Sequence, residues 1–230
     1  MAAGKSLTPF YIALAVIAVG GGALIASGAF RKAPPPLTLD TVGPLAQGPR
    51  GVLIGSDSAK IEVWEFSDFE CPYCARFAIL SMPDIRSRLV ETGRVRWRFV
   101  HYPLQGHTKS PTAHLAAACA NEQGRFWPMH DQLYEGQDAW TTARNLVGAL
   151  GEVAERAGLD RGRYDACMNE RGTAWGRVLA DKSLGDSVGI NGTPTFFVNG
   201  RQVPDILTFD RLRALTDSLA PLAPATPARR

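Results

Sequence analysis

The sequence has little excess charge and no run of charges of one sign. Its 25 Lys and Arg residues nearly balance 22 Asp and Glu residues, which leaves a net charge of +3. The basic residues are scattered among acidic ones, so nothing predicts a nucleic-acid-binding face. Histidine is also scarce, with four residues, and none stands at the usual spacing of a metal site. No metal or other cofactor is therefore expected.

Cysteine is equally scarce, with four residues in 230. Cys71 and Cys74 form a Cys-x-x-Cys pair, whereas Cys119 and Cys167 stand alone. A structural zinc site of the usual kind needs two such pairs, and an inert bridge closing so short a loop would stabilise the fold little. The spacing therefore favours a pair of thiols that exchange disulfides, provided that the chain works where disulfides persist.

Long hydrophobic runs are absent except for one near the N-terminus. The stretch 9–30 carries no charge, and about 20 such residues can span a bilayer. We predict a membrane anchor over residues 1–32. A cleaved signal peptide is the alternative, because Ser27-Gly28-Ala29 offers small residues at a cleavage site. No cysteine follows the segment, which excludes lipid attachment there, and the flanking positive charges balance, so they indicate no orientation.

Composition then divides the rest of the chain into three parts. Residues 33–50 are rich in Pro and Gly and predict a linker. Residues 51–219 carry the periodic patterns of a folded domain. Residues 220–230 form an Ala/Pro tail that we expect to be disordered.

The domain alternates strand and helix patterns. Strands are predicted at 61–66, 95–100 and 195–198, and Asn199-Gly200 predicts a tight hairpin into 201–203. A helix with a kink at Pro83 follows the first strand, and the last helix carries Leu212, Leu215 and Leu219 on one stripe. Because residues 108–181 have a helical composition, we predict an α/β fold interrupted by inserted helices.

The Cys-Pro-Tyr-Cys motif lies where the first strand gives way to a helix. Pro72 suits the first helical position, where its missing N–H is not needed. Cys71 would then be the N-cap, facing unpaired backbone N–H groups and the positive end of the helix dipole. We expect Cys71 to be the exposed thiol with a lowered pKa and Cys74 to be the more buried thiol that keeps its proton.

At this point the sequence resembles the DsbA-like branch of the thioredoxin superfamily. Three blocks carry the resemblance: Glu65-Phe66-Ser67-Asp68-Phe69-Glu70-Cys71-Pro72-Tyr73-Cys74, Gly124-Arg125-Phe126-Trp127-Pro128-Met129-His130-Asp131, and Gly189-Ile190-Asn191-Gly192-Thr193-Pro194-Thr195-Phe196-Phe197-Val198-Asn199-Gly200. The resemblance covers roughly residues 51–219. It implies a thioredoxin-like fold with an inserted helical subdomain.

The resemblance also implies roles for three further residues. Pro194, preceded by Thr193, matches the cis-proline whose loop lies against the active-site sulfurs; an ordinary turn proline is the alternative. Glu65 matches a buried carboxylate that relays a proton to or from Cys74. Strand alternation agrees with burial, although a carboxylate at the strand rim is the other interpretation.

The second cysteine pair falls in the helical block. In a compartment that permits disulfides, Cys119 and Cys167 are expected to form a structural bridge. Two buried free thiols are the alternative, as is a relay that exchanges electrons with Cys71 and Cys74.

The resemblance implies a protein-disulfide oxidoreductase, first of all a dithiol oxidase for exported proteins. We expect a single-pass membrane protein whose catalytic domain faces the periplasm or the extracellular space. Its partners would be exported proteins with cysteine thiols and a quinone-linked membrane reoxidase of the DsbB or VKOR type. An isomerase or reductase on the same fold, or a non-redox chaperone or assembly factor, remains an alternative.

Overall fold

The computed structural model describes residues 11, 12, 14, 50–204 and 207–219. The chain divides into two units, Met1–Thr38 and Leu39–Arg230. The predicted anchor (1–32), linker (33–50) and tail (220–230) lie outside the described residues, except for Tyr11, Ile12, Leu14 and Arg50. Tyr11, Ile12 and Leu14 are helical. Within the part that is described, no helix is both long enough and apolar enough to cross a membrane.

A five-stranded mixed sheet in the order β1-β3-β2-β4-β5 forms the centre of the second unit. Strands β2 (Ile61–Ser67) and β3 (Val95–His101) pair in parallel, and β4 (Thr195–Val198) pairs with β2 in the antiparallel direction. The three strands predicted from the sequence are thus confirmed as the centre of the sheet. Strand β1 (Val52–Ile54), which pairs with β3, was not predicted.

The hairpin that follows β4 has the predicted geometry. Asn199 and Gly200 adopt φ values of 49° and 79° between β4 and β5 (Arg201–Gln202). Positive φ at both central residues is what a two-residue type I′ turn requires. The Asn199 side chain also accepts a hydrogen bond from the backbone N–H of Glu62 at 2.8 Å, which ties the turn to β2.

The helix after β2 is interrupted earlier than predicted. Helix α2 (Pro72–Leu80) ends before Ser81, and α3 (Met82–Ile85) continues into a π-helical turn, η2 (Arg86–Val90). Pro83 has no backbone N–H and its ring opposes the carbonyl of the preceding turn, so the break falls just before Pro83 instead of at it. The predicted single kinked helix is therefore three short segments.

Six helices form the insertion between β3 and β4. They run from Ser110 to Ser187, so the helical region ends six residues beyond the predicted 181; they are α4 (Ser110–Glu122), α5 (Phe126–Glu135), α6 (Gln137–Thr142), α7 (Leu146–Arg156), α8 (Arg161–Glu170) and α9 (Gly172–Ser187). Their core is rich in alanine, with Ala113 and Ala116–Ala118 fully buried along α4. Small side chains let the neighbouring helices approach α4 closely.

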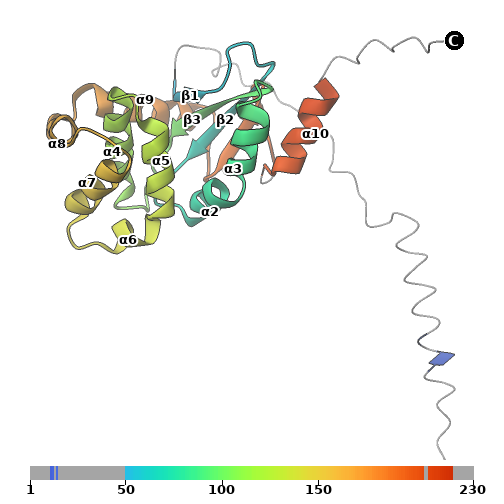
Figure 1. The fold of residues 1–230 in the computed structure, drawn as a ribbon, viewed down its shortest axis with the longest axis horizontal. Coiled ribbons are helices and arrows are strands. Elements are labelled where there is room, and N and C mark those ends of the chain that lie inside the picture. The colour runs from blue at the N-terminus through green and yellow to red at the C-terminus, as the bar shows by residue number, and fades with distance from the viewer. Residues whose placement is uncertain (1–10, 13, 15–49, 205–206, 220–230) are drawn as a thin grey trace, which may run out of the picture. The chain divides into compact units, whose positions relative to one another are not determined.

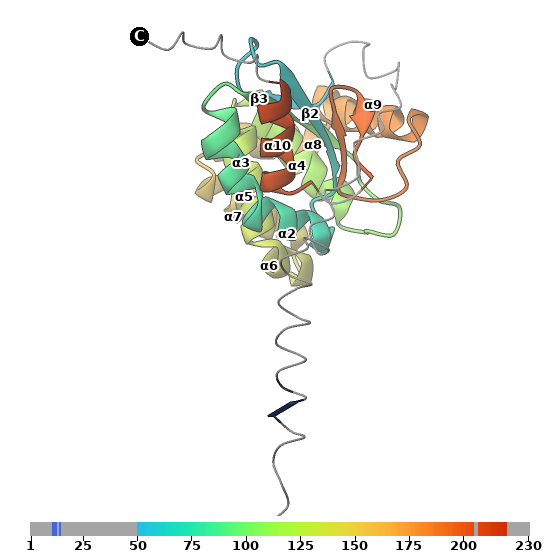
Figure 2. The ribbon, with the colours of Figure 1, turned by 90° about the vertical axis from the view of Figure 1, so that its right-hand side faces the viewer.

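Helices cover both sides of the sheet (Figures 1 and 2). The last helix, α10 (Phe209–Leu219), lies beside α3, whereas α4 contacts α5 and α9, and α9 contacts β3. Leu212 is fully buried and Leu215 half-buried on the predicted stripe of α10. Because α2 also contacts α5, the start of α2 lies where the sheet meets the inserted helices.

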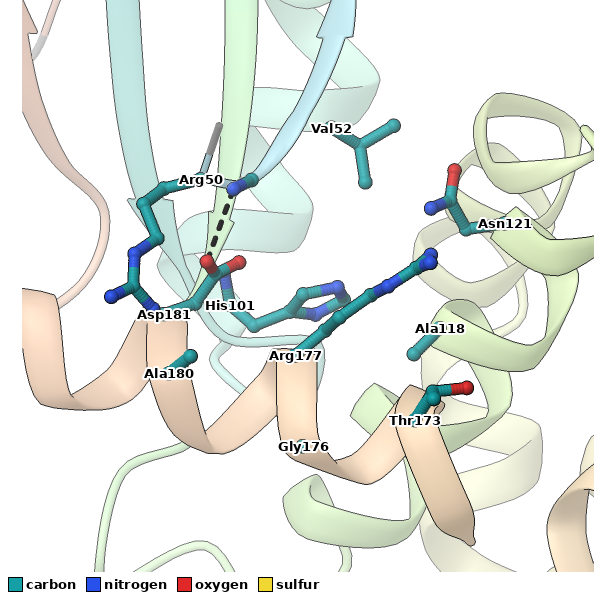
Figure 3. Close-up of a pocket in the computed structure, with 11 residues that line it drawn as sticks. Arg50, Val52, His101, Ala118, Asn121, Thr173, Gly176, Arg177, Ala180 and Asp181 are labelled. Atoms are coloured by element: carbon teal, nitrogen blue, oxygen red, sulfur yellow. Dashed lines mark hydrogen bonds between the residues drawn. The ribbon is translucent and has the colours of Figure 1, made fainter. Parts of the chain in front are cut away.

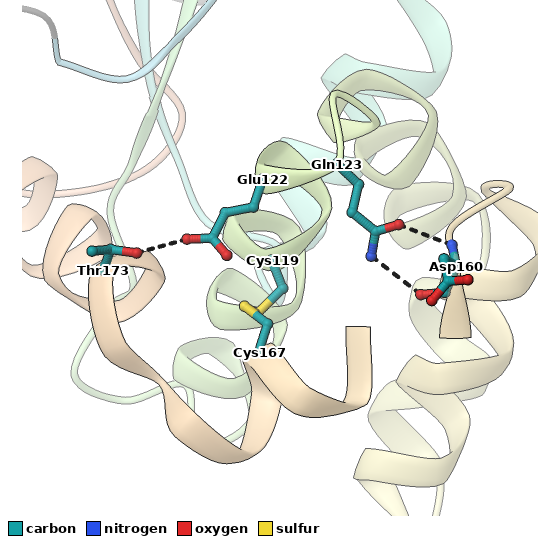
Figure 4. The surroundings of a disulfide bond; sticks show 6 residues. All are labelled: Cys119, Glu122, Gln123, Asp160, Cys167 and Thr173. Carbon is teal, nitrogen blue, oxygen red and sulfur yellow. Dashed lines mark hydrogen bonds between the residues drawn. A yellow bond between two sulfur atoms is a disulfide. The ribbon is translucent and has the colours of Figure 1, made fainter. Parts of the chain in front are cut away.

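A disulfide joins Cys119 in α4 to Cys167 in α8, with 5.8 Å between their Cα atoms. Figure 4 shows contacts on either side of it. Thr173 donates a hydrogen bond to Glu122, and Gln123 both donates to and accepts from the backbone of Asp160. The bridge therefore fastens α8 to α4 in a region that side-chain hydrogen bonds also hold.

Removing this bridge should lower the stability of the domain without touching the other cysteine pair. It spans 48 residues, and loop-closure entropy gives at most about 4 kcal/mol for a loop of that length. In the Cys119→Ala/Cys167→Ala variant we expect the free energy of unfolding in urea to fall by up to that amount. A change within about 0.5 kcal/mol of the wild type would show that the bridge does not stabilise the fold.

Candidate active site

Cys71 and Cys74 lie at the junction of β2 and α2. Cys71 is the N-cap of α2, with extended backbone angles (φ −75°, ψ 122°), and Pro72 occupies the first helical position. The backbone N–H of Cys71 donates to the carbonyl of Asp68 at 3.1 Å, and the Cys71 carbonyl accepts from Ala75 at 3.1 Å. The helix thus begins at the residue that the motif predicts, and its free N–H groups face the Cys71 sulfur.

The two thiols differ in exposure, but by less than expected. Cys71 is 4% exposed and Cys74 is fully buried. Both are free thiols in this structure. The prediction of an exposed Cys71 is wrong, because the loop that precedes β4 covers it: the carbonyl of Thr193 lies 3.4 Å from the Cys71 sulfur. The Thr193–Pro194 peptide bond in this loop is cis.

Their surroundings set the two pKa values apart. The hydrogen bond from the Cys74 thiol lowers the pKa of Cys71 to about 6; burial opposes the change, and the Thr193 side chain and the backbone N–H groups of Cys74 and Tyr73 add to it. Burial raises the pKa of Cys74, and the neighbouring Cys71 raises it further. Near neutral pH, Cys71 is therefore a thiolate and Cys74 a thiol, which is the asymmetry that disulfide exchange requires.

Glu65 lies on β2 and is 1% exposed, so it is not at the strand rim. Its Oε2 accepts a hydrogen bond from the indole N–H of Trp97 at 2.9 Å, whereas its Oε1 has no partner. Burial raises the pKa of Glu65, and the charge of His130 and the bond from Trp97 oppose that rise. The side chain is thus placed to favour a neutral, proton-bearing form.

Two acids just before the Cys-Pro-Tyr-Cys motif hold the turn between β2 and α2, a role that the sequence did not suggest. Asp68 is fully buried and accepts hydrogen bonds from several groups: the backbone N–H groups of Glu70 and Leu104 and the hydroxyl of Ser110, with the imidazole of His107 at 2.7 Å. Glu70 accepts from the backbone N–H groups of Lys109 and Ser110. The turn is therefore fastened to the first turn of α4.

A third residue outside the motif completes this support. The side-chain amide of Gln137, at the start of α6, donates to the carbonyls of Phe69 and Cys71 at 2.6 and 3.1 Å. Gln137 lies 66 residues from Cys71, and no local pattern could have indicated the contact.

The hydrogen bonds of Asp68 also set its charge. Burial alone would raise the pKa of Asp68, but His114 and Ser110 more than offset that effect and hold this pKa below its usual range.

The histidines pack around the site. His101, His114 and His130 are buried, and the Nδ1 atoms of His101 and His114 lie 2.8 Å apart. Burial lowers the pKa of both His101 and His114. Among residues 50–204 and 207–219, no group of three His, Cys, Asp or Glu side chains is placed to hold a metal ion.

A cavity of about 800 Å³ lies between β1, α4 and α9 (Figure 3). Its wall includes Asp181, whose carboxylate accepts hydrogen bonds from the backbone N–H groups of Gly51 and His101 at 3.0 and 3.2 Å. Asp181 thereby joins α9 to the start of β1 and the end of β3. Neither Glu65 nor either cysteine of the pair lines this cavity.

A buried dithiol with unequal pKa values, at the N-terminus of the helix that follows a central strand, defines a thiol–disulfide oxidoreductase site on a thioredoxin-like fold. The family model described as Thioredoxin matches residues 47–218. The chain therefore belongs to the thioredoxin family, and within it to the DsbA-like thiol–disulfide oxidoreductases, as the motifs predicted.

Individual relatives agree with this assignment. The chain is 26% identical over 170 residues to the probable disulfide bond formation protein D of Bacillus anthracis, covering 71% of this chain and 76% of that protein. The crystal structure of oxidised BdbD from Bacillus subtilis is similar with a TM-score of 0.64 and 25% identity, covering 72% of this chain and 90% of that one.

A third similarity is to part of much longer proteins. The Na⁺/H⁺ antiporter NhaA 3 of Salinispora tropica is 40% identical over 149 residues, which is 64% of this chain. The chain spans 21% of that antiporter's length, and 24% of the length of a related antiporter from Salinispora arenicola.

The lowered pKa of Cys71 can be measured directly. In the reduced protein, we expect the alkylation rate of Cys71 by iodoacetamide to rise with pH and to reach half its maximum near pH 6, because only the thiolate reacts. Cys74 should stay unmodified across this range. A midpoint near the ordinary thiol value of about 8.5 would contradict the described environment of Cys71.

Proposed function

We propose that this protein is a dithiol oxidase that introduces disulfides into exported proteins. The observation that supports it best is the unequal environment of the two thiols. A thiolate that is stabilised at Cys71 favours the reduced form of the pair, and a pair whose reduced form is stabilised is a strong oxidant. The proposal therefore follows from the direction of the Cys71 pKa shift.

The electrons pass between the two cysteines and the substrate thiols. A substrate thiolate attacks the Cys71 sulfur of the Cys71–Cys74 disulfide, and Cys74 leaves with the electron pair and takes up a proton. The second substrate thiolate then attacks the substrate sulfur of the mixed disulfide, and Cys71 leaves as a thiolate. Two electrons pass from the substrate to the enzyme.

The position of the loop that carries Thr193 and Pro194 suits this loop to a substrate-binding role. The Thr193 carbonyl already lies against the Cys71 sulfur, so a substrate chain that bonds to Cys71 must lie along the same loop. Extended segments pair through backbone groups with chains that pass beside them. Thr193 and Pro194 are therefore proposed to orient the substrate cysteine.

Turnover and location complete the proposal. A quinone-linked membrane reoxidase of the DsbB or VKOR type would restore the Cys71–Cys74 disulfide. An N-terminal anchor over residues 1–32 would keep the catalytic domain at the extracytoplasmic face of the membrane. The membrane anchor and the membrane reoxidase would together place the enzyme near newly exported chains.

The reduction potential separates an oxidase from a reductase on the same fold. Equilibration of the domain with glutathione should give a value near −120 mV, about that of DsbA, if the protein is an oxidase. A value near −270 mV, about that of thioredoxin, would instead mean that electrons flow from this protein to its substrates.

Substrate trapping tests whether the protein acts on other proteins at all. In the Cys74→Ala variant, Cys71 can still form a mixed disulfide but no resolving thiol remains, so mixed disulfides should accumulate on non-reducing gels. The Cys71→Ser variant keeps Cys74, whose sulfur is buried, and should accumulate none. Equal trapping by both variants would exclude Cys71 as the attacked sulfur.

A further inference from the structure

Two hydroxyl groups lie beside the buried half of the active site. Ser67 is the last residue of β2 and Tyr134 belongs to α5; both are almost completely buried. Their oxygen atoms lie 2.9 Å apart, within hydrogen-bonding distance. Neither the motif nor the cysteine chemistry accounts for this pair.

Strand geometry places Ser67 between Glu65 and the cysteines. Successive side chains of a strand alternate between its faces, so Glu65 and Ser67 share one face. Ser67 is the nearer of the two to the end of β2 that leads into α2. Glu65, Ser67 and Cys74 are each at most 1% exposed, so bulk water does not reach the space that they share.

The hydroxyl pair has one more proton than its mutual hydrogen bond uses. Each hydroxyl carries one donor hydrogen, and one of the two lies in the bond between them. The other needs an acceptor in a region without bulk water. The buried residues named above offer two acceptors: the Oε1 atom of Glu65, which has no partner, and the sulfur of Cys74.

The pKa shifts of Glu65 and Cys74 agree with a position of the Ser67 hydroxyl between these two groups. The Ser67 hydroxyl lowers the pKa of Glu65 and of Cys74, in each case against a larger rise caused by burial. Burial raises the pKa of Tyr134, and the charges of Cys74 and Glu65 raise it further. The phenol of Tyr134 thus stays protonated and available as a donor to Ser67.

We propose that Ser67, held in place by Tyr134, carries the proton between Glu65 and Cys74. When a substrate thiolate breaks the Cys71–Cys74 bond, Cys74 leaves with the electron pair. Ser67 gives its hydroxyl proton to the Cys74 sulfur and receives the proton of the Glu65 carboxyl group. Glu65 is left as a carboxylate and regains a proton from solution, where ionisation of the substrate thiol released one.

Reoxidation uses the same path in reverse. Cys74 must lose its proton before its sulfur can attack the mixed disulfide formed by Cys71 and the reoxidising partner. Ser67 then takes that proton and passes its own to Glu65. In this proposal Ser67 is the group that exchanges a proton with the reacting sulfur, and Tyr134 is a positioning residue that acts through Ser67. This inference rests on the proposed thiol–disulfide exchange.

The test measures how fast dithiothreitol reduces the Cys71–Cys74 disulfide in stopped-flow experiments. Ser67→Ala removes the hydroxyl, and we expect the rate to fall by at least about 10-fold, because general acid–base catalysis typically contributes about 10²–10⁴-fold. Ser67→Thr restores a hydroxyl on a strand-compatible side chain and should recover most of the rate. Alkylation of Cys71 should keep its midpoint near pH 6 in both variants.

Tyr134→Phe and Tyr164→Phe form a matched pair. Each removes one buried phenol hydroxyl, but the Tyr164 hydroxyl in α8 has no hydrogen-bond partner. We expect Tyr134→Phe to slow reduction several-fold and Tyr164→Phe to leave the rate unchanged. Equal rates in the two variants would contradict the positioning role of Tyr134.

A double-mutant cycle decides whether the proton comes from Glu65. If Ser67 relays that proton, Ser67→Ala should slow the Glu65→Gln variant by less than 2-fold, because the donor is already gone. A full additional loss in the double variant would overturn the relay, as would a wild-type rate in Ser67→Ala. If Cys74→Ala accumulates no more mixed disulfides than Cys71→Ser, the proposed function itself fails, whatever the Ser67 variants do.

Discussion

Removal of water from the end of β2 is the constraint on which the site depends. Strands β3 and β4 flank β2, and the side chains at its C-terminal end are buried on both faces. In this environment a charge is costly unless fixed dipoles face it. Cys71 meets such dipoles at the start of α2, whereas Cys74 and Glu65 do not meet enough of them. The same burial therefore gives opposite results for the two sulfurs.

Local signals were sufficient for the elements that carry the chemistry. A run of β-rich residues, a proline in the first helical position and an Asn-Gly turn each act within a few residues, and β2, α2 and the β4–β5 hairpin follow from them. Strand β1 escaped prediction because three half-buried residues carry no periodicity. The early end of α2 at Leu80 shows that the effect of Pro83 extends toward the preceding turn.

The contacts that complete the site could not be predicted in this way. Asp68 reaches Ser110 across 42 residues and Ser67 reaches Tyr134 across 67. Such pairs depend on how the inserted helices pack on the sheet, which no short pattern encodes. The exposure of Cys71 was overestimated for the same reason, because the covering loop at Thr193 lies 122 residues along the chain.

The attachment of the β2–α2 turn to α4 has a consequence for the order in which the protein matures. Glu70 is held by the backbone N–H groups of Lys109 and Ser110, which leave the ribosome almost 40 residues after it. Chains fold from the N-terminus as they are made, so both active-site cysteines exist before their scaffold does. The Thr193 loop, which helps to lower the pKa of Cys71, is made later still, 122 residues along the chain. The growing chain thus carries Cys71 through synthesis before this thiol has its full reactivity.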